Sequence, residues 1–104
     1  MIVVNTDYIP GREFDVIGLV TGGCIMCKHI GKDIGASFRN MVGGEMEAYT
    51  QLMMETKDRA VSYILGQAQQ YGADAVINVR FSSTTIVQGG SEILVSGTAV
   101  KFRT

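Results

Sequence analysis

The chain has no excess of charge of either sign. Its 104 residues include nine Lys and Arg and ten Asp and Glu, which gives a formal net charge of −1 at pH 7. Sequence-independent binding of nucleic acid depends on many Lys and Arg contacts to phosphate. Nine basic residues spread among ten acidic ones do not form such a surface, so we expect no nucleic-acid partner.

Long apolar runs are also missing. Residues 1–7 lack a basic region followed by an apolar stretch, so we expect no signal peptide there. No segment approaches the roughly 20 apolar residues that a membrane-spanning helix needs. These two absences predict a cytoplasmic protein with no membrane partner.

Groups for catalysis are scarce. His29 is the single histidine, and no serine nucleophile motif accompanies it. The glycine pairs at 22–23 and 89–90 lack the lysine and the spacing of a phosphate-binding loop. We therefore expect a protein that is not an enzyme and has no catalytic residues.

What the chain does have is apolar character. Hydrophobic residues make up 46% of the sequence and charged residues 18%, in a length that supports one domain over residues 1–104. A domain of this size buries roughly 65% of the surface of its unfolded chain, which allows one modest core. The remaining apolar surface predicts contact with other subunits.

Periodicity and glycine punctuation predict a β-α-α-β-β order in the α+β class, with an antiparallel sheet. One long helix, with a face that includes Met53, Ala60, Ile64, Ala68 and Tyr71, covers one side of the sheet. Gly66 in this helix suggests that another segment approaches closely there, and Gly72 is expected just past its end. The other sheet face is partly apolar, so we expect a partner chain to cover it. The expected elements are strands at 2–5 and 13–21, a short helix from Asp33 to about 42, the long helix at about 45–71, and strands at 74–81 and 92–102. Glycines 22 and 23 are expected to end the second strand, and residues 23–31 either continue as an extended strand or form a loop. Residues 82–91 are expected to form a polar connection.

Short glycine-containing segments recur in a specific order across nearly the whole chain. They resemble those of the YbjQ-like family, which carries a heavy-metal-binding label. The resemblance implies a dodecin-like α+β subunit in a homo-oligomeric ring, either a pentamer or two pentamers paired as a decamer. The resemblance implies no enzymatic activity, and it supplies no agreed set of metal ligands. The matching segments are Gly18–Gly22, Ile30–Ile34, Val42–Glu45 with Tyr49, Ala68, Gly72–Val76, Asn78–Ser82, Gln88-Gly89 and Gly97–Val100.

One cluster, Cys24-x-x-Cys27-x-His29, departs from the family, which usually has polar and basic residues here. Thiolate and imidazole suit zinc or a soft ion such as Cu(I), and a tight turn would let both sulfurs reach one ion. The fourth ligand would be water, Met26, the Asp33 carboxylate or a residue of a neighbouring subunit. The alternatives are two small buried thiols with a surface histidine, or a redox pair. The leading hypothesis is a homo-oligomeric binding protein for a soft or transition metal.

A second hypothesis needs no metal. Glu45 and Tyr49 lie one turn apart at the start of the long helix and could line a ligand pocket between subunits; the alternative is helix capping by Glu45 and core packing by Tyr49. The protein would then be an oligomeric small-molecule binder or a scaffold. Arg80 alternates with apolar neighbours in the strand predicted at 74–81. We expect it to face an interface or to pair with a carboxylate rather than to clamp a substrate.

Overall fold

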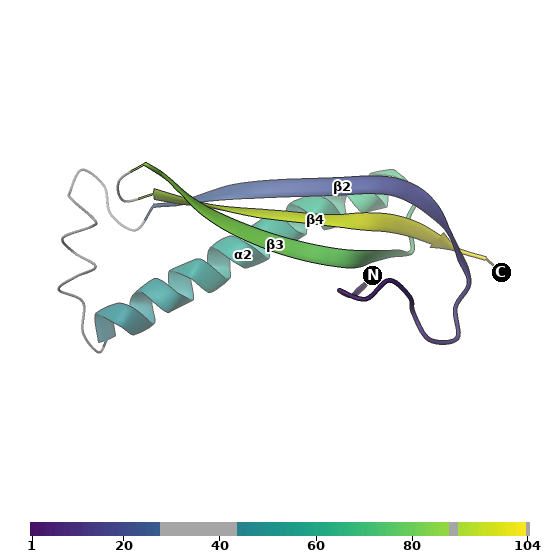
Figure 1. Ribbon diagram of the computed structural model, residues 1–104, viewed down its shortest axis with the longest axis horizontal. Helices are drawn as coiled ribbons and strands as arrows, with labels where there is room; N and C mark the ends of the chain where they lie inside the picture. Colours follow the sequence, from purple (N-terminus) through teal and green to yellow (C-terminus); the bar gives the residue numbers. More distant parts are fainter. Residues whose placement is uncertain (28–43, 88–89, 104) are drawn as a thin grey trace.

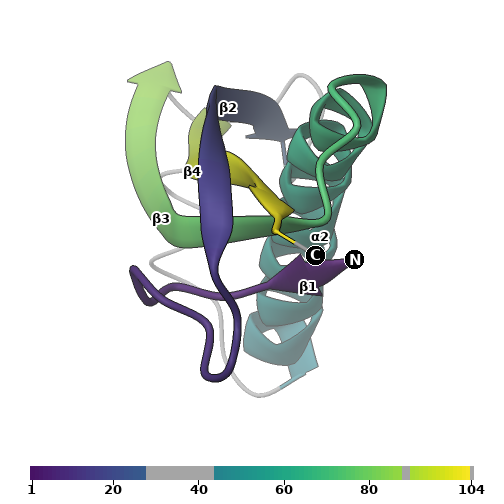
Figure 2. The same ribbon diagram turned by 90° about the vertical axis from the view of Figure 1, so that its right-hand side faces the viewer.

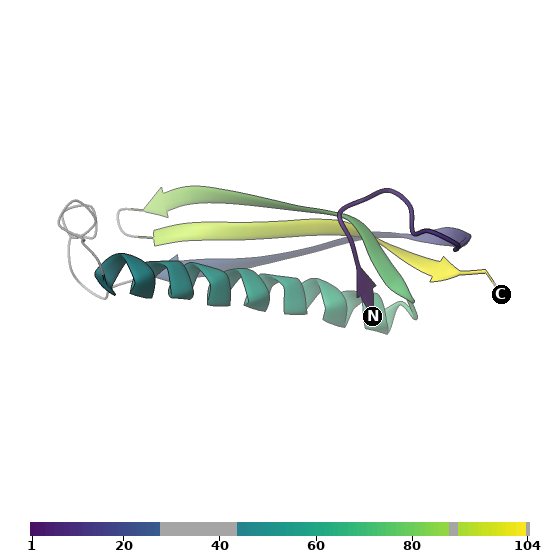
Figure 3. The same ribbon diagram turned by 90° about the horizontal axis from the view of Figure 1, so that it is seen from below.

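The computed structural model describes residues 1–27, 44–87 and 90–103. The strands form one sheet in the order β1-β3-β4-β2, and the long helix runs along one of its faces (Figure 1). Seen from below, the helix and the strands form two layers (Figure 3), and an end view places the helix on one side of the strands (Figure 2). The elements are β1 (Ile2–Val3), β2 (Phe14–Cys27), α2 (Gly44–Gln70), β3 (Ala75–Val87) and β4 (Gly90–Phe102).

The predicted α+β class, with one long helix packed on one sheet face, is confirmed. The pairs β2–β4 and β3–β4 are antiparallel as expected. β1 pairs with β3 in parallel, so the sheet is mixed rather than purely antiparallel. The short helix predicted from Asp33 to about 42 lies outside the described residues, and the ring stays a prediction. In the part of the chain that is described, no helix is long and apolar enough to cross a membrane.

The strands run further than the sequence predicted. β2 does not end at Gly22 and Gly23, because these two residues pair with Val95 and Leu94 of β4. β3 continues through the polar stretch at 82–85, which was predicted to be a connection. Serine and threonine are compatible with a strand whose one face is not covered by the helix.

Gly22 is the residue that lets the helix approach the sheet. A Cβ at this position would lie 2.9 Å from the carbonyl oxygen of Ala60 and 2.9 Å from Cβ of Tyr63. The close approach predicted at Gly66 is wrong, since a Cβ added there would meet nothing within 4 Å. The strand, not the helix, supplies the glycine at this contact.

The helix ends where its sequence predicts. Gly72 adopts a φ of 74°, and its N–H donates to the carbonyl of Gln69 at 3.0 Å. The N–H of Ala73 donates to the carbonyl of Ala68 at 2.9 Å. These two bonds form a Schellman motif, with glycine in the left-handed conformation that L side chains disfavour.

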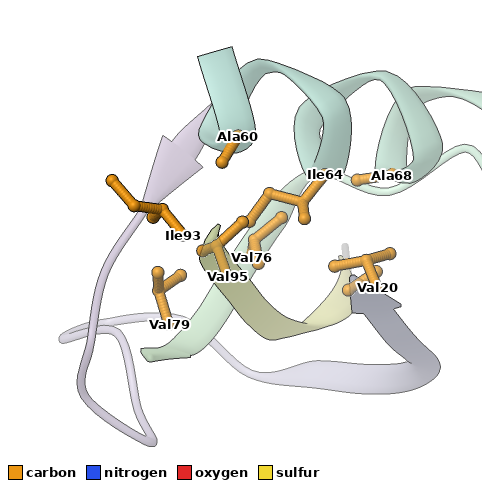
Figure 4. Close-up of a cluster of buried hydrophobic side chains, with 9 residues drawn as sticks. Val20, Ala60, Ile64, Ala68, Val76, Val79, Ile93 and Val95 are labelled. Atoms are coloured by element: carbon orange, nitrogen blue, oxygen red, sulfur yellow. The ribbon is translucent and has the colours of Figure 1, made fainter. Parts of the chain in front are cut away.

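The main core lies between α2 and the sheet (Figure 4). The predicted helix positions Ala60, Ile64 and Ala68 are fully buried, whereas Met53 and Tyr71 at the two ends of the predicted face are exposed. The small alanines let the helix lie close to the strands over its second half. The buried members of this cluster are Val20, Ala60, Ile64, Ala68, Val76, Val79, Ile93, Val95 and Ala99.

A second, smaller core lies on the other face of the sheet. Ala75, Ile77 and Val100 are buried there beneath the N-terminal segment, from which Val4 and Ile9 pack against them. Backbone hydrogen bonds tie this segment to β3, among them one of 3.0 Å from the N–H of Val4 to the carbonyl of Val76. Only this end of the face is covered by described residues.

The rest of that face carries exposed apolar side chains, and we call it the open face. Val20 faces the helix, so its neighbours Leu19 and Thr21 point the other way, and the register extends this face to β4 and β3. Leu19 is 69% exposed, Ile25 57% and Leu94 43%. The radius of gyration is 16.9 Å, against about 13 Å for a compact domain of this length. The open face comprises Leu19, Thr21, Gly23, Ile25, Arg80, Ser82, Glu92, Leu94 and Ser96.

Replacing Gly22 with alanine should destabilise the fold. The added methyl group meets the backbone of α2, and overpacking of this kind costs about 1–3 kcal/mol. Gly18→Ala is the matched control, because a Cβ there meets nothing within 4 Å. Urea denaturation of both variants measures the difference, and equal midpoints would contradict the close contact at Gly22.

Two helix glycines should respond in opposite directions to alanine. Gly66→Ala should raise the free energy of unfolding by about 0.5–1 kcal/mol, because alanine is the better helix former and the position is open. Gly72→Ala should lower it by about 1–2 kcal/mol, because alanine is strained at a φ of 74°. Thermal unfolding of the two variants side by side checks the opposite signs.

Candidate functional site

Cys24 is half-buried and packs against the main core between α2 and the sheet. Nη1 of Arg59 donates a long hydrogen bond of 3.9 Å to its sulfur. The guanidinium charge beside the sulfur opposes a cation at that point. The packing of Cys24 against the core fits the alternative of a small buried thiol, which is one of the interpretations drawn from the sequence.

The tight turn expected between Cys24 and Cys27 does not form. Residues 24–27 belong to β2 and pair in register with residues 93–90 of β4. Two positions three residues apart in an extended strand lie on opposite faces and about 10 Å apart along the strand. Such a spacing exceeds the reach of a disulfide, which speaks against a redox pair within one chain.

The metal site built from Cys24, Cys27 and His29 stays a prediction. His29 lies outside the described residues, as does the Cys27 side chain. Among the side chains that the structure describes, no three Cys, His, Asp or Glu residues come together as ligands for one ion. The donor types still suit a soft metal, but one subunit does not bring both cysteine positions to one point.

Glu45 and Tyr49 lie in the first two turns of α2, and their side chains are outside the described residues. One turn further on, a groove of about 290 Å³ opens between the helix and the sheet. Met53 and Met54 line its helix side, and Phe81, 51% exposed, lines its strand side. Local sequence patterns do not indicate this groove, because they predict Met53 in the core and residues 82–91 in a connection. We call it the methionine groove.

A second hollow lies on the open face. It has a volume of about 360 Å³ and is lined by Arg80, Leu94 and three hydroxyl residues, Thr21, Ser82 and Ser96. Nη1 of Arg80 donates to the carbonyl of Asn5 at 2.8 Å and to the carbonyl of Val79 at 3.1 Å. Within residues 1–27, 44–87 and 90–103, no carboxylate pairs with Arg80.

Charged groups at the opposite end of the sheet form ion pairs and a hydrogen bond within the fold. Asp15 lies 2.7 Å from Nη2 of Arg103, and the hydrogen bond and charge of this carboxylate raise the pKa of Arg103. Asp74 accepts from the backbone N–H of Phe102 at 2.8 Å and lies 3.8 Å from Nζ of Lys101. Arg80 differs from these two basic residues because its described partners are neutral carbonyls.

Comparison with known proteins places the chain in a family. A family model described as "Putative heavy-metal-binding", YbjQ_1, matches residues 1–103. A UPF0145 protein of Vibrio parahaemolyticus is 49% identical over 103 residues, covering 98% of each chain. A UPF0145 protein of Fervidobacterium nodosum is 47% identical over 104 residues, covering 99% of this chain and 96% of the relative.

The fold also has a solved counterpart. A crystal structure of a DUF74-family protein of unknown function from Pediococcus pentosaceus superposes with a TM-score of 0.70 and 12% identity, covering 99% of this chain and 98% of that one. This likeness shows the fold alone. The match to the family model and the two close relatives confirm the resemblance found in the sequence: the chain belongs to the YbjQ-like family.

Proposed function

We propose that this protein is a binding protein rather than an enzyme, and that it works as a homo-oligomeric ring whose ligand site is completed between subunits. The observation that carries the proposal is the open face, where the apolar side chains of Leu19, Ile25 and Leu94 are all exposed. Exposed apolar surface of this kind on a small subunit is typical of a protein interface. The elongated shape also leaves more surface to cover than a compact domain has.

A second copy of the chain suits this face. Arg80 and Glu92 are its charged residues in the described strands, and their signs are opposite, so no like-charge excess repels another copy. The methionine groove offers a different apolar surface on the helix side of the sheet. Two unlike apolar surfaces on opposite sides of one subunit favour a head-to-tail contact, which closes into a ring. A pentamer, or two paired as a decamer, is the assembly that the family resemblance implies.

The first candidate ligand is a zinc ion or another soft or transition metal, bound by Cys24, Cys27 and His29 in a cytoplasmic protein whose thiols stay reduced. The family description and the thiolate and imidazole donors support this choice. Because positions 24 and 27 lie on opposite faces of β2, ligands for one ion would come from more than one copy.

The second candidate is a small organic molecule, or a scaffold role, at a site near Glu45 and Tyr49 that involves no metal. The methionine groove favours it, since Met53 lies one helical turn after Tyr49 and lines the groove. A neighbouring copy over this groove would enclose a pocket between subunits.

Leu19→Glu should dissociate the assembly. Leu19 is 69% exposed in the subunit, so the charge costs little in folding but would be buried without a partner at the interface. Tyr71→Glu, just after the end of α2, is the control, since Tyr71 is 54% exposed and away from the open face. Light scattering should give a ring for the wild type and the control, and a folded lone subunit for Leu19→Glu. A wild type that is already a stable lone subunit at high dilution would contradict the proposal.

Titration with zinc and with Cu(I) separates the two candidate ligands. We expect stoichiometric binding by the wild type, and loss of that binding in Cys24→Ser combined with Cys27→Ser. The dissociated Leu19→Glu variant should bind at least about tenfold more weakly, because its ligands no longer come from several copies. If the cysteine-free variant keeps an intact ring and binds zinc and Cu(I) as tightly as the wild type does, the second candidate is favoured.

A further inference from the structure

We infer that the open face carries a binding subsite for a small oxyanion, a carboxylate or phosphate group, held by Arg80 with the hydroxyls of Thr21, Ser82 and Ser96. This subsite is separate from the cysteines, which are further along β2. The ligand would be a small organic anion or free phosphate. Its charged group would lie at Arg80.

Arg80 is oriented without being neutralised. The bonds from its Nη1 to the carbonyls of Asn5 and Val79 hold the guanidinium in place. A guanidinium has five N–H donors in a planar fork, so these two bonds leave donors for a ligand. Neutral carbonyls do not cancel its charge as a carboxylate would.

Three neighbouring strands bring the hydroxyls to this charge. Thr21 of β2 pairs in register with Ser96 of β4, which pairs with Arg80 of β3, so the three form one row across the open face. Ser82 lies two residues beyond Arg80 on the same face. Among the described residues, no hydrogen bond uses the hydroxyl of Thr21, Ser82 or Ser96, so all three can donate to an oxyanion.

The backbone of Thr21 is held in place by a side chain of α2. Its N–H donates to Oε1 of Gln67 at 3.1 Å, and its carbonyl accepts from Nε2 of the same side chain at 3.0 Å. The helix thus locks the outer strand where the row begins. A preorganised site loses less free energy on binding than one that must first be ordered.

The subsite has an apolar wall and a suitable size. Leu94 lies over Gly23, where an added Cβ would be 2.8 Å from Cδ2 of Leu94. The hollow of about 360 Å³ lies at the small end of the range for ligand pockets. One cation, hydroxyl donors and an apolar wall together fit a small organic anion better than an uncharged ligand.

The inference rests on the proposed assembly only for enclosure of the pocket. A neighbouring copy on the open face would form the second wall and shield the charge from water. The row of donors itself belongs to one subunit, so a lone subunit would still bind, more weakly.

The test is calorimetric titration of the full chain with inorganic phosphate and with succinate, at low ionic strength. We expect Arg80→Gln to weaken the binding of the better probe by about tenfold or more, since a charge-assisted pair is lost. Arg59→Gln is the matched control: it removes the same charge on the helix side, and we expect less than a twofold change. Thr21→Val with Ser96→Ala should weaken binding by about tenfold while leaving Arg80 in place. Light scattering on every variant records the assembly.

The outcomes separate this inference from the proposed function. Binding that depends on Arg80 in a wild type that is a lone subunit would uphold the subsite and overturn the ring. An intact ring that binds neither probe, or binds equally in Arg80→Gln and Arg59→Gln, would overturn the subsite. A third outcome would also overturn the subsite: the wild type binds no anion, and Arg80→Gln dissociates the ring. Arg80 would then pair with a carboxylate of a neighbouring copy.

Discussion

The contact between α2 and the strand face at Gly22 is the constraint on which the rest of the structure depends. Ala60 and Ala68 on the helix and a missing side chain at Gly22 allow the two layers to meet closely. One helix of this length covers one face of a long sheet, so the packing that builds the core also leaves a second face to be covered in another way. The N-terminal segment covers only one end of it.

This division between the faces also separates the chemistry. Cys24 lies on the helix side beside Arg59, whereas Arg80 and its neighbouring hydroxyls lie on the open side. A role for the thiols and a role for Arg80 are therefore independent within one subunit. The two sides would come together only where one copy meets the next, which is where an oligomer places new sites.

Local sequence signals predicted the helix but not the strand ends. The 3.6-residue spacing of Ala60, Ile64 and Ala68 and the glycine at 72 depend on neighbours along the chain, and the structure confirms them. Gly22 pairs with β4 and contacts α2, and both elements are distant from it in the sequence. No local pattern therefore shows that the strand continues through Gly22. The row that contains Arg80 depends on the register of three strands, which the sequence does not specify.

The side chain of Gln67 has a further consequence for the outer edge of the sheet. Its amide occupies both backbone groups of Thr21 that point away from β4. An unpaired strand edge is a template for uncontrolled addition of strands from other molecules, which leads to aggregation. By pairing with both of these groups, Gln67 blocks the addition of another strand at Thr21 and makes disordered growth along this part of β2 less favourable.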